Sequence, residues 1–97
     1  MSERASSLRL DLWLYRTRFF KTRTLATAFA AKGKVRISRF GAVRRAKNGA
    51  VQVLADDVLT FAQKQRIIMI KVLAMPMRRG PAVEAVLCYE PLEEKNV

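Results

Sequence analysis

The chain has 97 residues, with 19 lysine and arginine side chains against eight acidic ones, so its formal net charge is +11. Histidine is absent and cysteine occurs once, which excludes Cys/His zinc sites, histidine-based catalytic triads and internal disulfides. A chain of this length forms one domain and buries too little surface to enclose a large substrate cavity, so we expect a function on the surface.

The first predicted element is a helix over residues 8–18 with Ser7 as its N-cap. Three apolar side chains follow the i, i+3, i+4 rule and are expected to face the core: Leu10, Trp13 and Leu14. Arg9 and Arg16 are seven residues apart, so on this helix they would project together as one basic ridge.

A second helix is predicted over residues 23–32, because Thr22 is a good N-cap and Gly33 supplies the left-handed residue that ends a helix. The inward side chains of this helix are expected to be Leu25, Ala26 and Phe29. Two short helices joined by a tight connection make a helical hairpin.

Beyond the second helix the hydrophobic period changes from helical to alternating. Val35 and Ile37 point to one side, which is typical of a half-buried strand. The outward side chains of this strand are expected to be Lys34, Arg36 and Ser38. Residues 39–49 contain two glycines and four cations but few core candidates, so we interpret them as a mobile basic loop that holds at most one short strand.

The rest of the chain predicts a small sheet and a short helix. The segments rich in valine, isoleucine and leucine are residues 50–54, 58–62 and 66–74. Pro81, followed by Ala-Val-Glu-Ala, predicts a short helix to about Tyr89. The expected fold class is α/β in the α+β sense: a helical hairpin packed on a small, mostly antiparallel sheet, with a short C-terminal helix.

The positive charge is confined to one half of the sequence. Residues 1–47 hold 13 lysines and arginines against two acidic residues, a net charge of +11, whereas residues 48–97 hold six of each sign. Such a distribution creates a positive field that faces one direction, and its natural partner is a polyanion. A basic surface without any such role is the alternative. An anionic membrane is disfavoured, because the aromatic residues of the first helix fall on several sides.

Aromatic and cationic residues interleave at the predicted start of the second helix. Phe19 and Phe20 are expected mainly as core anchors, whereas Lys21 and Arg23 can converge on one phosphate at the helix N-terminus. The predicted phosphate contacts are Lys21, Arg23, Lys34, Arg36 and Arg39, with Thr22 capping the helix that presents the first two. The patch is expected to extend to Arg9, Arg16, Arg44, Arg45 and Lys47.

The sequence shows no catalytic pattern. Glycine-rich nucleotide motifs are absent, and the adjacent carboxylates Asp56-Asp57 and Glu93-Glu94 project divergently, so we interpret them as a polar turn and a solvated tail. Cys88 lies in an apolar segment and is expected to be a buried, inert thiol. We therefore expect no catalytic residue, metal, cofactor or small-molecule substrate. Because no apolar run has membrane-spanning length and no secretory signal is present, we expect a cytoplasmic protein without a membrane partner.

Three motifs carry a family resemblance: R-L-D-x-W-L at residues 9–14, R-F-F-K-T-R at residues 18–23 and K-G-K-V-R at residues 32–36. Together they resemble the RNA-binding domain of the S-four type, named after small-subunit ribosomal protein four. Within that superfamily, R-R-G-P-A-x-E-A at residues 78–85 and L-C-Y-E at residues 87–90 make the chain most similar to the fifteen-kilodalton bacterial heat-shock protein family.

The resemblance implies a helical hairpin on a small sheet, with RNA held at residues 21–23 and 34–39. Similar proteins bind ribosomal RNA, and the heat-shock subgroup binds free large ribosomal subunits blocked by a nascent chain still attached to tRNA. Two departures stand out. The family usually has Asn-Gly after the first strand, whereas this chain has Arg39-Phe40-Gly41, which predicts a longer turn; the subgroup often ends in a basic tail, whereas this chain ends in an acidic segment.

The sequence thus predicts a non-catalytic protein that binds structured RNA, with ribosomal RNA or the large ribosomal subunit as the expected partner. Residues 9–90 would form the RNA-binding domain, between a frayed N-terminus at residues 1–8 and an acidic tail at residues 91–97. Two alternatives stay open: the targeting module of an RNA-modifying enzyme, and a protein-interaction domain for an acidic partner. The oligomeric state is left open as well.

Overall fold

The computed structural model describes residues 6–92. In chain order the elements are β1 (Ser7–Arg9), α1 (Leu10–Arg16), α2 (Arg23–Ala31), β2 (Arg36–Arg39), β3 (Ala42–Arg45), β4 (Gln52–Leu54), β5 (Val58–Gln63), β6 (Arg66–Val72), α3 (Ala82–Ala85), the 3₁₀ turn η1 (Val86–Cys88) and β7 (Tyr89–Pro91). None of the helices in this part of the chain is both long and apolar enough to cross a membrane.

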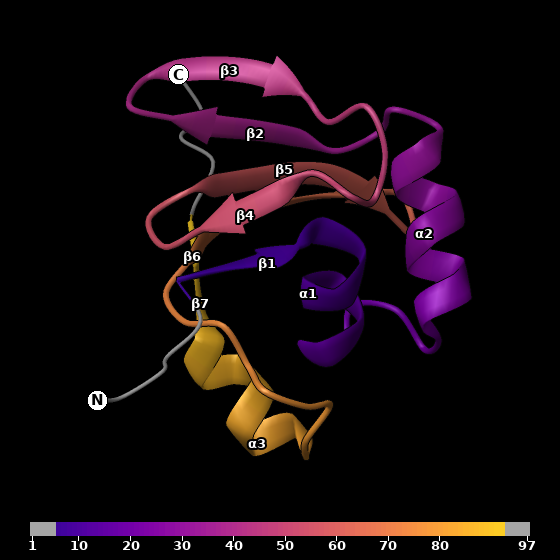
Figure 1. Ribbon diagram of the computed structural model, residues 1–97, viewed down its shortest axis with the longest axis vertical. Helices are drawn as coiled ribbons and strands as arrows, with labels where there is room; N and C mark the ends of the chain where they lie inside the picture. Colours follow the sequence, from indigo (N-terminus) through magenta and orange to yellow (C-terminus); the bar gives the residue numbers. More distant parts are fainter. Residues whose placement is uncertain (1–5, 93–97) are drawn as a thin grey trace.

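Two antiparallel sheets and a helical hairpin make up the fold. The larger sheet has the strand order β3-β2-β5-β6-β7, and β1 pairs with β4 in a separate two-stranded sheet. Helices α1 and α2 pack against each other, α2 beside the sheets (Figure 1). The β2–β3 hairpin and α3 lie at opposite ends of the molecule (Figure 1). The predicted α+β class is confirmed.

The core forms where α1 meets α2 and the inner faces of the sheets. Trp13 is fully buried, and its indole N–H donates to the carbonyl of Ala74 at 3.0 Å, which ties α1 to the chain beyond β6. Helix α2 buries Ala26 and Ala30 instead of the larger Leu25, which is exposed. The prediction that Leu25 points inward is therefore wrong, whereas Ala26 is buried and Phe29 packs against the core. Ala26 and Ala30 are four residues apart and mark the buried face of α2, and Leu25 lies about 100° away from that face around the helix.

The first helix begins later than predicted. Residues Ser7–Arg9 are extended and pair with β4, and the amide of Leu10 donates to the carbonyl of Val51 at 2.8 Å. Ser7 is consequently a strand residue, and Arg9 occupies the N-cap position of α1 without a side-chain cap. Part of the expected frayed end thus lies in β1, whereas residues 1–5 lie outside the described residues.

The segment predicted as a mobile basic loop contains one regular strand, β3, which forms a hairpin with β2. Arg39 pairs with Ala42 across a two-residue turn, Phe40-Gly41, so β3 follows β2 directly. Both turn residues have positive φ angles, 52° and 81°, as a type I′ turn requires. The prediction of a longer turn is wrong, because Phe40 adopts the left-handed conformation that usually favours asparagine or glycine at this position.

The C-terminal helix is shorter than predicted. α3 ends at Ala85, continues as η1, and gives way to β7, which pairs with β6 through Tyr89 opposite Val72. The edge of β6 offers backbone partners to any extended segment beside it, so the chain leaves the helical conformation at Tyr89. The expected acidic tail starts within β7 at Pro91, and residues 93–97 lie outside the described residues.

Candidate nucleic-acid interface

The connection between α1 and α2 is held by side chains from the second half of the sequence. Arg79 donates from Nε to the carbonyl of Tyr15 at 3.1 Å and from Nη2 to the carbonyl of Phe20 at 3.3 Å. Gln63 Nε2 donates to the carbonyl of Phe19 at 2.8 Å. These bonds fix the backbone that leads into α2, and with it the place of the cations at the start of that helix.

The two phenylalanines of this connection are core anchors, as predicted. The Phe19 ring stacks on Trp13, with ring centroids 6.2 Å apart. The Phe20 ring contacts Phe29 of α2 at 5.1 Å and lies near Phe61 of β5. Both rings are only partly accessible, so the contribution of this segment to a surface site comes from its cations.

The N-terminus of α2 is capped and carries no acidic residue in its first turn. The hydroxyl of Thr22 accepts a hydrogen bond from the amide of Leu25 at 3.0 Å, which confirms the predicted cap. Lys21 and Arg23 are exposed beside it, and Arg23 Nη2 lies 3.9 Å from a carboxylate oxygen of Asp11. The positive end of the helix dipole is thus flanked by two accessible cations.

A second group of cations surrounds a hollow of about 430 Å³ between the end of α2 and the β2–β3 hairpin. Lys34, Arg36 and Arg45 line it, and Arg36 lies directly opposite Arg45 in the strand pair. None of the three side chains has a hydrogen bond or ion pair within residues 6–92. Like charges directly opposite each other destabilise an antiparallel strand pair. The stability of the fold therefore does not explain why Arg36 lies opposite Arg45.

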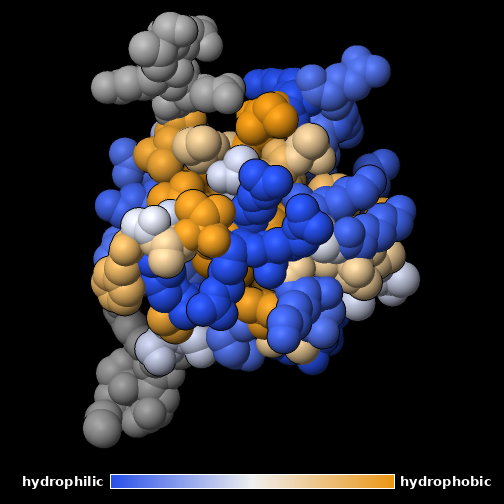
Figure 2. Space-filling model, turned by 90° about the horizontal axis from the view of Figure 1, so that it is seen from above, coloured by the Kyte–Doolittle hydropathy of each residue, from blue (hydrophilic) through white to orange (hydrophobic). Residues whose placement is uncertain are grey.

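Local packing explains why Arg45 reaches this hollow. The backbone of Ala46 donates to Val35 at 2.9 Å, which brings the end of β3 next to the segment leaving α2. Gly33 leaves room for the aliphatic stem of Arg45, since a Cβ on this glycine would lie 3.1 Å from Arg45 Cδ. Seen from above the hairpin, hydrophilic side chains gather across the middle and one side of this face, with hydrophobic ones among them (Figure 2).

Arg39 lies in a different environment from Arg36. Its Nε and Nη2 atoms donate to the two carboxylate oxygens of Asp57, both at 2.8 Å, and Nη2 also donates to the carbonyl of Gln52 at 3.2 Å. The Asp57 side chain is 1% exposed and also accepts from the amide of Leu54 at 2.8 Å. The prediction that Asp57 belongs to a merely polar turn is therefore wrong; it anchors β2 to the β4–β5 connection.

A second buried carboxylate organises the start of α1. Asp11 accepts hydrogen bonds from Arg9 Nε and Nη2 at 3.1 and 2.9 Å, from the Thr27 hydroxyl at 2.9 Å and from the amide of Leu12 at 2.7 Å. Burial by itself raises the pKa of the Asp11 carboxyl, but these hydrogen bonds and the charge of Arg9 together hold that pKa below its ordinary value. Asp11 thereby links β1, α1 and α2.

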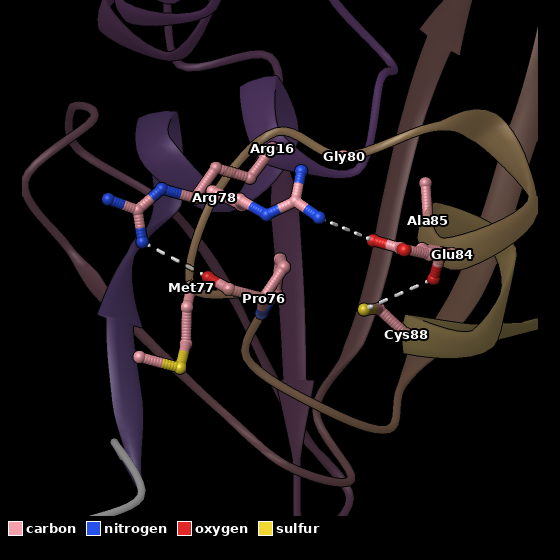
Figure 3. A pocket seen from close by; sticks show the side chains of 8 residues that line it. All are labelled: Arg16, Pro76, Met77, Arg78, Gly80, Glu84, Ala85 and Cys88. Carbon is pink, nitrogen blue, oxygen red and sulfur yellow. Dashed lines mark hydrogen bonds and ion pairs between the residues drawn. The ribbon is translucent and has the colours of Figure 1, made fainter.

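Arg16 lines a different hollow from the one that Lys34, Arg36 and Arg45 border. Its Nη1 atom donates to the carbonyl of Pro76 at 3.0 Å, at a hollow of about 220 Å³ (Figure 3). Across that hollow Arg78 pairs with Glu84 at 3.4 Å. The predicted ridge of Arg9 and Arg16 is not formed, because Arg9 belongs to β1 and the seven-residue helical spacing does not apply.

The predicted cations therefore divide into three sets. Those with no hydrogen bond or ion pair among residues 6–92 are Lys21, Lys34, Arg36, Arg44, Arg45 and Lys47. Those held by a buried carboxylate or a backbone carbonyl are Arg9, Arg16 and Arg39, while Arg23 is loosely paired. Asp11 and Asp57 were not identified from the sequence as residues that position cations. Each is directly followed by an apolar residue, Leu12 or Val58, in a strongly basic chain, and this is the signal for a buried carboxylate with a cationic partner. In the part of the chain that the structure describes, no three metal-ligating side chains gather.

Known proteins share both the sequence pattern and this fold. Escherichia coli heat shock protein 15 is 36% identical over 90 residues, which cover 93% of the chain and 64% of that protein. The Haemophilus influenzae homologue is 36% identical over 86 residues, covering 89% of the chain and 62% of the homologue. A trimeric structure of Vibrio cholerae heat shock protein 15 matches with a TM-score of 0.78 at 32% identity, covering 89% of this chain and 82% of that one. The chain belongs to the heat shock protein 15 family.

Membership of the heat shock protein 15 family confirms the resemblance to the fifteen-kilodalton heat-shock proteins. No protein-family model matches the chain. The chain spans 64% of the length of the Escherichia coli relative. The match takes in 93% of the chain, so it extends over both the basic first half and the neutral second half.

Proposed function

We propose that the chain is a non-catalytic RNA-binding protein that holds structured RNA, with ribosomal RNA as its partner, mainly through backbone phosphates. The observation that carries the proposal is the convergence of Lys34, Arg36 and Arg45 on one hollow without a protein partner among residues 6–92. Cations placed opposite each other on a strand pair are stabilised when a polyanion lies between them.

The spacing of the two groups of cations supports a contact with an extended backbone. Lys21 and Arg23 lie at the start of the nine-residue helix α2, and Lys34 lies three residues beyond its last residue, Ala31. A helix of this length spans about 13–14 Å at 1.5 Å per residue. Phosphate groups of one RNA strand can reach both ends of such a helix. Contacts of this kind read backbone shape and not base sequence, so sequence specificity is expected to be modest.

The ion pairs of Arg9 and Arg39 are compatible with this function. Each pair fixes a guanidinium group by a buried carboxylate and leaves part of it accessible; the Arg39 side chain is 37% exposed. A cation held in place loses less conformational entropy when it binds a phosphate than a mobile one does. These two residues are therefore proposed as positioned members of the interface.

Salt dependence of RNA binding tests the proposal. Neutralising about five phosphates gives a slope of log Kd against log salt of roughly 3.5 to 4.5 in magnitude, taking about 0.7 to 0.9 per contact. The double variant Arg36→Gln/Arg45→Gln should lower this magnitude by about 1.4 to 1.8. The matched control Lys64→Gln/Arg66→Gln removes the same charge from the β5–β6 turn and should leave the slope within about 0.5 of the wild type. A salt-independent Kd, or equal effects of both double variants, would contradict the proposal.

The finer proposal is that the RNA belongs to large ribosomal subunits blocked by a nascent chain attached to tRNA, as the family resemblance implies. Co-sedimentation of the chain with purified large subunits, with and without peptidyl-tRNA, tests this step. Retention only on subunits that carry peptidyl-tRNA is the expected result. Equal retention on vacant subunits would restrict the proposal to ribosomal RNA binding in general. Loss of the complex after nuclease treatment would exclude a purely protein-mediated contact with an acidic partner.

A further inference from the structure

The tip of the β2–β3 hairpin presents an aromatic ring in an unfavourable backbone conformation. Phe40 has a φ of 52° and its side chain is fully exposed. A bulky residue rarely adopts this left-handed conformation, and no burial compensates for it here. Asparagine or glycine would serve the turn better. A strained and fully exposed ring points to a function outside the folding of the chain itself.

Phe40 borders a hollow of about 490 Å³ under the hairpin, on the opposite face of β2 from the hollow lined by Arg36. Its apolar lining comes from Ile37, Ala42 and Val51, and its polar lining from Arg39, Arg44 and Gln52. The combination of one flat ring, an apolar floor and cations at the margin suits a planar group attached to an anionic backbone.

Arg39 brings a rigid donor to this hollow. Its Nε and Nη2 atoms are engaged with Asp57 and Gln52, whereas Nη1 has no partner among residues 6–92. Because the bidentate contact with the carboxylate fixes the guanidinium plane, the two N–H groups of Nη1 have a set direction. Arg44 adds a second cation, which has no ion pair in the described part of the chain.

We propose that Phe40 and this hollow bind one unpaired nucleobase of the bound RNA, with the base stacked on the Phe40 ring and Arg39 Nη1 donating to the edge of the base or to its phosphate. This inference rests on the proposed function and deepens it: the preferred RNA contains an unpaired nucleotide beside a structured region. Stacking of bases on aromatic side chains tolerates any base, in keeping with backbone-based recognition.

The charge of the hairpin argues against a second copy of the chain as the occupant. Arg39, Arg44 and Arg45 lie within a few residues of the ring, and the whole chain carries a net charge of +11. Two such hairpins would repel each other across an apolar contact, whereas a nucleotide brings its own phosphate to the margin of the hollow.

The test compares two RNA probes of equal length, a hairpin with a single-stranded loop and a fully paired duplex, by fluorescence anisotropy at one salt concentration. The variant Phe40→Asn keeps a residue that fits the turn and removes the ring. The wild type should prefer the loop-containing probe, and the variant should bind that probe about 5- to 150-fold more weakly, as loss of one base–aromatic stack predicts. Duplex affinity and the salt slope should be unchanged. The matched control is Val43→Asn, since Val43 is an exposed apolar residue of the same hairpin; it should have no effect.

Each other outcome overturns a distinct statement. If the wild type binds both probes and Phe40→Asn retains the preference for the loop, the base-binding inference is wrong while RNA binding stands. If the wild type binds neither probe, the proposed function fails and the inference fails with it. If Phe40→Asn lowers the mass seen by sedimentation and leaves the RNA preference intact, the ring serves contact between copies. A thermal melt of the variant at or above the wild-type temperature verifies that it is folded.

Discussion

Replacing Asp57 by asparagine is expected to destabilise the fold far more than the same replacement at Asp56. Asp57 is 1% exposed and accepts two bonds from Arg39 and one from Leu54, all at 2.8 Å. An amide in its place loses the charge and turns one acceptor into a donor that faces the guanidinium group. Hydrogen bonds to charged groups contribute about 1.5–3 kcal/mol each, and Arg39 can regain some water, so we expect a loss of about 2–3 kcal/mol in the free energy of unfolding.

Asp56 provides the matched control for this substitution. It is 81% exposed and lies 3.7 Å from Lys71, and its φ of 76° is one that asparagine tolerates. Asp56→Asn should therefore cost less than about 0.5 kcal/mol. In a domain of this size Asp57→Asn should lower Tm by about 10–20 °C and Asp56→Asn by no more than a few degrees. Equal shifts, measured by circular dichroism at pH 7, would refute the assignment of Asp57 as the buried anchor of β2.

Three further predictions concern stability. Gly49→Ala should lower the free energy of unfolding by about 1–3 kcal/mol, because the new Cβ would lie 2.6 Å from Asp11 Oδ2. Gly41→Ala should lower it by only about 1 kcal/mol through backbone strain, because a Cβ there meets no atom within 4 Å. Urea unfolding of the two variants measures both losses. Thr22→Ala should cost about 1 kcal/mol through loss of the α2 cap, without a change in the urea m-value. The pKa of Asp11 is lower in the folded chain than its ordinary value of 3.8. The ionised carboxylate therefore stabilises the fold fully above about pH 4, and this stabilisation is lost as the pH falls below that value. Asp11→Asn should remove this part of the acid sensitivity, and a pH profile of the free energy of unfolding identical to that of the wild type would contradict the prediction.

The helical hairpin could be predicted from the sequence because residues close together in the chain determine where its second helix begins and ends. The Thr22 cap and the left-handed Gly33 act within one turn of the helix they bound. The alternation of Val35 and Ile37 likewise needs only neighbouring residues to be interpreted, and both side chains are buried.

The predictions that failed depend on partners far away in the sequence. Ser7–Arg9 is extended because it pairs with the strand Gln52–Leu54. The residues around Ser7 contain no pattern that predicts strand pairing with a segment some forty residues away. The same holds for the site: the number of cations can be counted in the sequence, but their pairing cannot. Whether Arg39 faces solvent or a carboxylate depends on where Asp57 lies in the folded chain.

Arg79 and Gln63 hold the backbone between α1 and α2, so the two halves of the sequence have different roles in the basic surface. The first 47 residues carry as much net charge as the whole protein, yet the direction in which that charge points is dictated by residues from the electrically neutral remainder. A peptide excised from the amino-terminal half would keep the electrostatics of a polyanion ligand and lose its geometry. Grafting this surface onto another scaffold would accordingly require Arg79 and Gln63 to be transferred along with it.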